Sequence, residues 1–146
     1  MTIYVDSSIV ANAYLDDEVG HVESLALLYN PESPVMSGTL TPIEVAGALV
    51  RAARAGRGDR DHLLAMLGED VADGGPVTIL ATPQEQVEVR AMQIVCETRL
   101  RAIDAWHIAV AENLFEAVGE PGATPVFATL DREQAEVAAA MGFEVI

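Results

Sequence analysis

The 146-residue chain has the length of one domain, and its 51% hydrophobic and 5% aromatic content describes a globular protein rather than a disordered one. The single cysteine, Cys96, excludes an intrachain disulfide, and no apolar run approaches the ~20 residues that cross a bilayer. The net charge of −15, with no lysine among the basic residues, opposes nucleic-acid binding over most of the surface. Any such function therefore requires a local basic patch.

The chain opens with a short apolar strand, Thr2–Val5. No basic segment precedes an apolar one, so we expect no signal peptide and a cytoplasmic protein. A strand this short and apolar is typical of the buried centre of a parallel sheet. Asp6 follows at its carboxyl end, where open α/β sheets bind ligands. Ser7 or Ser8 can cap the following helix, and an N-cap role for Asp6 itself is equally compatible with the sequence.

Two helical segments, Ile9–Leu15 and His21–Tyr29, precede a second strand at Val35-Met36. The next helix begins near Thr41, which is followed by proline and, three residues later, by Glu44. This spacing predicts a capping box, in which Glu44 stabilises the helix start. The same position also puts Glu44 near the carboxyl end of the second strand, and the two roles are compatible.

Half of the positive charge lies within ten residues, at Arg51, Arg54, Arg57 and Arg60. The two glycines inside this segment argue against one continuous helical stripe. The segment is interpreted either as a solvated helix end favoured by the helix dipole or as a basic patch for phosphates or an acidic partner.

The second half of the chain continues the alternation of helices and strands, which predicts a parallel sheet covered on both faces. Cys96 lies within a helical pattern, and we expect it to be buried as a small hydrophobic residue. The predicted elements are the helix Asp59–Ala72, the strand Val77–Leu80, the helix from Pro83 to about Leu100, a helix that begins with Arg101–Ala111, the strand Val126–Thr129, the helix Asp131–Met141 and the strand Phe143–Ile146.

Two further acids stand out in this half. Asp131 directly follows the fourth strand, and Asp104 is the lone acid at the start of an apolar helix, where an N-cap is the alternative role. If these acids meet Asp6 and Glu44 at one sheet edge they repel, by about 4 kcal/mol for two carboxylates ~4 Å apart at an effective dielectric of ~20. Such a cluster needs protons or a cation. Oxygen ligands suit Mg²⁺ or Mn²⁺, and the chemistry that fits is phosphodiester hydrolysis with metal-activated water.

The residues around the acids also resemble a known family. The four motifs, in this order and spacing, resemble the PIN-domain nucleases, and most of all the VapC toxins of type II toxin–antitoxin pairs. The resemblance covers essentially the whole chain, residues 1–146, as a single PIN domain, and it implies a three-layer α/β fold with a parallel sheet of four or five strands. The motifs are Tyr4-Val5-Asp6-Ser7-Ser8, Ile43-Glu44-Val45-Ala46-Gly47-Ala48-Leu49, Ile103-Asp104-Ala105-Trp106-His107-Ile108-Ala109 and Ala128-Thr129-Leu130-Asp131.

The resemblance further implies a Mg²⁺- or Mn²⁺-dependent endoribonuclease, a cognate antitoxin and a homodimer, for which the two early helices could supply surfaces. An RNA substrate would reach the site through the Arg51, Arg54 and Arg57 region. For His107, packing is preferred over a metal or substrate role. By position, the resemblance makes Asp6 and Asp104 the primary metal ligands, Glu44 a ligand or holder of metal-bound water, Asp131 the acid that completes the pocket, and Ser8 and Thr129 the supporting hydroxyl residues.

Two other functions are compatible with the same sequence. One is a non-catalytic PIN-like module that binds RNA or a protein, although all four acids are present. The other is a housekeeping RNA-processing nuclease with the same chemistry. Metal-dependent thermal stabilisation separates an active site from a non-catalytic one, and a neighbouring antitoxin reading frame separates a toxin from a housekeeping enzyme.

Overall fold

A computed structural model describes residues 1–146, and its centre is a parallel five-stranded sheet with the strand order β3-β2-β1-β4-β5. The predicted α/β class with a parallel sheet is confirmed. In register, Ile3 of β1 lies opposite Val35 on one side and Val126 on the other, so the first strand is central. The strands are β1 Ile3–Val5, β2 Val35–Gly38, β3 Val77–Leu80, β4 Val126–Ala128 and β5 Glu144–Val145.

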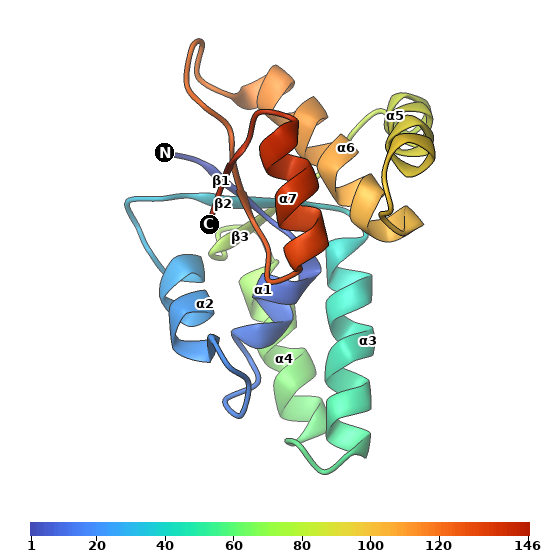
Figure 1. Ribbon diagram of the computed structural model, residues 1–146. Helices are drawn as coiled ribbons and strands as arrows, with labels where there is room; N and C mark the ends of the chain where they lie inside the picture. Colours follow the sequence, from blue (N-terminus) through green and yellow to red (C-terminus); the bar gives the residue numbers. More distant parts are fainter.

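Seven helices cover the two faces of the sheet (Figure 1). The first four pack on one face with the larger hydrophobic cluster, and the last three pack on the other face with the second cluster. No helix is both long and apolar enough to cross a membrane. The helices are α1 Ser7–Asn12, α2 His21–Leu28, α3 Thr41–Arg54, α4 Arg60–Asp70, α5 Gln84–Glu97, α6 Ala102–Val118 and α7 Arg132–Ala140.

The alternation of side chains along β1 explains how one short strand serves both layers. Ile3 and Val5 point into the α1–α4 layer, whereas Tyr4 points into the α5–α7 layer, and none is more than 1% exposed. Tyr4 stacks on Phe127 of β4 with ring centroids 5.3 Å apart. The strand is buried on both faces, as its apolar sequence predicts.

The strand order reverses direction between β1 and β4. From β1 the chain adds β2 and then β3 on one side, and it returns to the other side of β1 with β4 and β5. Ligands of open α/β folds bind at the carboxyl ends of strands beside such a switch point. Here Asp6 follows β1 and Thr129 follows β4, so both lie at that position.

Close packing at the end of β2 brings α6 against the sheet. A Cβ added to Gly38 would lie 2.6 Å from the Trp106 ring and 2.9 Å from Val110. Such distances are far below ordinary contact, so any larger residue would have to displace the Trp106 and Val110 side chains. The first turns of α6, including Asp104, are thereby held near the carboxyl ends of the strands.

Two local predictions are wrong. The capping box does not form: Leu40 is the N-cap of α3 without a side-chain bond, and the Thr41 hydroxyl bonds to Ser37 of β2 instead. Cys96 is exposed rather than buried, because the inward side of α5 is defined by Val87 and Ile94 and two further residues of helix rotate Cys96 by about 200° from Ile94.

Candidate active site

Asp6 is the N-cap of α1, so the capping role left open by the sequence is real. Its Oδ1 accepts from the backbone N–H groups of Ser8 and Ile9, at 3.0 and 3.3 Å, and from the Ser8 hydroxyl at 2.6 Å. Burial raises the pKa of Asp6, although the nearby His107 and the donors on Ser8 oppose the shift. The carboxylate is 4% exposed, and Ser8 orients it.

Thr129 joins the end of β4 to Asp6. Its hydroxyl lies 2.9 Å from Asp6 Oδ2 and accepts the Asp131 backbone N–H at 3.0 Å. Asp131 is the N-cap of α7 and accepts from the Gln134 backbone N–H at 2.8 Å. The segment after β4 therefore brings a hydroxyl and a carboxylate to the same edge as Asp6.

Glu44 is held by contacts from two other elements rather than by its own helix. The Ser7 hydroxyl of α1 donates to Oε2 at 3.1 Å, and Nε2 of His107 from α6 lies 2.7 Å from Oε1. Since an ionised carboxylate only accepts, Nε2 carries a proton and donates to Glu44, and the other ring nitrogen, Nδ1, forms a 2.7 Å hydrogen bond with the Tyr4 hydroxyl. Burial raises the pKa of Tyr4, which keeps its hydroxyl protonated.

His107 is therefore both packed and polar. It is 1% exposed, as the packing interpretation predicts, and it also links the centre of the sheet to Glu44. One turn of α6 separates it from Asp104, which puts the two side chains on one helix face. The three-residue spacing from Asp104 could have predicted that His107 lies beside the acids. Nothing in the sequence around Tyr4 indicated its hydrogen bond to His107.

Asp104 is not an N-cap, because Arg101 occupies that position in α6. Its carboxylate is 22% exposed and receives no hydrogen bond, and its only ionic contact is with exposed Arg101 at 3.9 Å. Burial and then the negative charges of Asp131 and Asp6 raise the pKa of Asp104. Arg101 and His107 oppose this shift without cancelling it, so a further cation beside Asp104 would be stabilising.

The four predicted acids thus gather around one sheet edge. Asp6, Asp104 and Asp131 interact through their charges, and Glu44 joins them through His107. No three His, Cys, Asp or Glu side chains stand close enough to hold one ion among them. Mg²⁺ is usually held by one or two carboxylates and keeps several waters, so the all-oxygen donor set of Asp6 and Asp104 fits such an ion.

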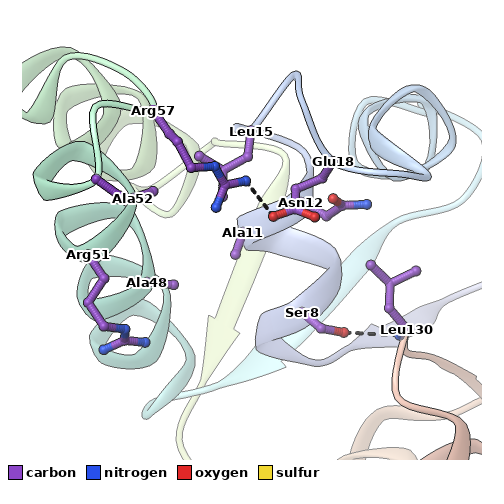
Figure 2. Close-up of a pocket in the computed structure, with 11 residues that line it drawn as sticks. Ser8, Ala11, Asn12, Leu15, Glu18, Ala48, Arg51, Ala52, Arg57 and Leu130 are labelled. Atoms are coloured by element: carbon purple, nitrogen blue, oxygen red, sulfur yellow. Dashed lines mark hydrogen bonds and ion pairs between the residues drawn. The ribbon is translucent and has the colours of Figure 1, made fainter.

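A cleft between α1 and α3 leads away from the acids. Two cavities, of about 410 and 350 Å³, share the lining residues Ser8, Ala11, Ala48 and Arg51, and the smaller one also reaches Glu44. Small side chains from the two facing helices line it (Figure 2). The cleft thus connects Glu44 with the Arg51 guanidinium group.

The candidate arginines differ in their availability. Arg57 forms a bidentate ion pair with Asp17, at 2.7 and 2.8 Å, and also contacts Glu18 (Figure 2). Arg51 and Arg54 are exposed and form no ion pair. Of these two, only Arg51 lines the cleft.

Comparison with protein families gives one match, in which the PIN domain model aligns with residues 3–140. No curated protein matches the sequence.

Solved structures with the same fold share little sequence with this chain. PAE2754 from Pyrobaculum aerophilum is 22% identical, with a TM-score of 0.61 over 99% of this chain and 89% of its own. VapC20 from Mycobacterium tuberculosis, described as a sarcin–ricin loop-cleaving toxin, is 16% identical, with a TM-score of 0.66 over 97% and 96%. VapBC-1 from nontypeable Haemophilus influenzae is 14% identical, with a TM-score of 0.60 over 100% and 97%.

Proposed function

The chain belongs to the PIN domain family, and we propose that it is a Mg²⁺- or Mn²⁺-dependent endoribonuclease that acts in the cytoplasm as the toxin of a toxin–antitoxin pair. The observation that supports this most strongly is Asp104, a partly buried carboxylate without a hydrogen-bond donor that faces two further acids. We treat residues 1–146 as a single PIN domain, in line with the match over residues 3–140.

The similar structures support the choice of RNA as substrate. VapC20 is described as a toxin that cleaves the sarcin–ricin loop, which is RNA. Another similar structure is described as a toxin–antitoxin complex from Klebsiella pneumoniae, 15% identical with a TM-score of 0.58 over 99% of this chain and 95% of its own. These descriptions support a toxin role with an antitoxin partner.

We assign the metal to the edge of the sheet beside β1 and β4. Asp6 and Asp104 would hold the ion directly, and Glu44 and Asp131 would act through water. When bound, a divalent cation offsets negative charge on the phosphodiester and lowers the pKa of water. The chain's own residues orient the acids: Ser8 and the start of α1 fix one carboxylate of the pair, and His107 fixes Glu44.

The RNA strand follows the cleft between α1 and α3, and Arg51 contacts one of its phosphates. Charge favours this path, since the rest of the surface is strongly acidic and repels RNA. Arg54 adds a second free positive charge nearby, whereas Arg57 contributes only if Asp17 and Glu18 release it.

Cleavage of a mixed, structured RNA pool tests the nuclease. We expect cutting with Mn²⁺ or Mg²⁺, none with EDTA, and none with Asp104→Asn. The matched control is Asp61→Asn, which neutralises an acid that is 88% exposed and lines neither cavity of the cleft. If the folded, antitoxin-free protein cuts no RNA with either metal, the nuclease proposal fails and a non-catalytic binding module replaces it.

The path of the RNA has its own test. Arg51→Glu should weaken cleavage and reduce the salt dependence of RNA binding by about one phosphate contact. Arg60→Glu is the control, because Arg60 pairs with Asp61 and lines neither cavity. Equal effects of the two variants would contradict a specific role for Arg51.

We further propose that the outer face of α2 takes part in assembly, either with the antitoxin or in a homodimer. Val22 is 71% and Tyr29 49% exposed, and Val19 just before the helix is 95% exposed. Measuring the molecular mass of Val22→Asp by light scattering, with and without the antitoxin, distinguishes a second copy of the chain from the antitoxin as the partner. Loss of the dimer assigns this face to a second copy, whereas an intact dimer that no longer binds antitoxin assigns it to the antitoxin.

A further inference from the structure

One buried polar side chain beside the acids, Gln134, was not among the predicted site residues. It lies in the first turn of α7 and is 0% exposed. A primary amide is seldom buried so completely unless both of its ends are hydrogen-bonded. Both ends are bonded here, and both partners belong to the acidic site.

The amide bridges two segments that carry the acids. Its Oε1 accepts from the Thr129 hydroxyl at 2.7 Å, and its Nε2 donates to the main-chain carbonyl of Asp104 at 3.1 Å. Its backbone N–H also donates to Asp131 at 2.8 Å. Gln134 therefore contacts the end of β4, the start of α6 and the start of α7 at once.

The direction of the amide fixes the Thr129 proton. Only the NH₂ end can face the Asp104 carbonyl, so the oxygen end faces Thr129 and receives its single hydroxyl proton. The Asp131 N–H donates to the same hydroxyl oxygen. Thr129 then has no proton left for Asp6 Oδ2, 2.9 Å away, and that oxygen keeps its lone pairs for another partner.

We propose that Gln134 is a positioning residue of the acidic site, which fixes the first turn of α6 relative to Asp6 and Asp131 and, by accepting the Thr129 proton, leaves Asp6 Oδ2 free for a divalent cation. This inference rests on the proposed function. Groups that orient metal ligands from behind typically contribute 10–100-fold to metal affinity.

The test is Mn²⁺ binding to Gln134→Met, which keeps the length of the side chain and removes both polar ends. Binding is measured by electron paramagnetic resonance, without RNA, at a temperature where circular dichroism finds every variant folded. We expect Mn²⁺ to bind about 10–100-fold more weakly than to the wild type. Gln134→Asn, which is too short to bridge both partners, should give the same result if the methionine variant does not fold.

Val137→Ala is the matched control, since Val137 is a partly buried residue of the same helix that packs in the α5–α7 layer. It should lower thermal stability without changing Mn²⁺ affinity. Wild-type affinity in a folded Gln134 variant would overturn the inference alone, as would equal weakening in Val137→Ala. Absence of Mn²⁺ binding by the wild type would overturn the inference together with the proposed function.

Discussion

Replacing Asp6 by asparagine should stabilise the metal-free protein while it abolishes metal binding. Asparagine is as good an N-cap as aspartate, so its Oδ1 can keep the bonds to Ser8 and to the start of α1. Its NH₂ group would replace Oδ2, which lies 2.9 Å from a Thr129 hydroxyl oxygen whose proton is directed to Gln134. An N–H···O bond would thus replace a contact between two acceptors.

The size of the effect follows from three contributions. The new hydrogen bond is worth about 1 kcal/mol, and removing a buried charge adds an effect of the same order. The lost attraction between the carboxylate and the helix dipole offsets about 0.5 kcal/mol. We therefore expect a net gain of about 1–2 kcal/mol, or roughly 2–8 °C in melting temperature for a chain of this size.

Thermal unfolding with EDTA at about pH 8 measures the gain, which should shrink in mild acid, where Asp6 of the wild type takes up a proton. Adding Mg²⁺ should then stabilise the wild type but not Asp6→Asn. Asp59→Asn is the control: it caps α4 in the same way, with a 2.8 Å bond from His62, but it is exposed and outside the acidic site. The reasoning is refuted if Asp6→Asn is no more stable than the wild type, or if the control gains as much.

Three further outcomes follow from the structure. Burial raises the pKa of Asp6 and of Asp104 in the folded state. Their contribution to the unfolding free energy of the metal-free protein is therefore fully present below the usual carboxyl pKa and is lost as the pH rises through the raised pKa values, which melting curves with EDTA should show. Tyr4→Phe removes the hydrogen-bond partner of His107 Nδ1. It should cost about 1–3 kcal/mol in urea unfolding and slow RNA cleavage, because His107 then supports Glu44 less firmly. Gly38→Ala should cost about 1–3 kcal/mol in the same urea assay through overlap with Trp106, whereas Gly68→Ala, in open space on α4, should gain up to about 1 kcal/mol.

The fold could be predicted from the sequence because the strands and helices of the sheet are specified by local patterns. Short apolar strands alternate with helices, and in parallel sheets an acid after a strand must lie at the carboxyl edge. Asp6 and Asp131 could therefore be assigned to that edge from their positions alone. Asp104 could be singled out because it is the only acid in an apolar helix start.

The contacts that hold the acids could not be predicted in this way. The partner of Glu44, His107, is 63 residues away, and its bond replaces the capping box that the local spacing predicts. Gln134 looks like an ordinary polar residue of an amphipathic helix until the neighbouring segments are placed around it. The predicted burial of Cys96 was wrong because a helical pattern indicates that a helix forms more reliably than it indicates which of its sides faces the core.

The topology also determines when during synthesis the site can form. The Thr129 hydroxyl contacts an acid that was made 123 residues earlier, and β1 obtains its second neighbouring strand only when β4 has emerged. Until then Asp6 can cap α1, but the residues that follow β4 are not yet beside it. The complete acidic edge therefore cannot form until residues 126–131 have been synthesised, whereas Asp6 is made at the start of translation.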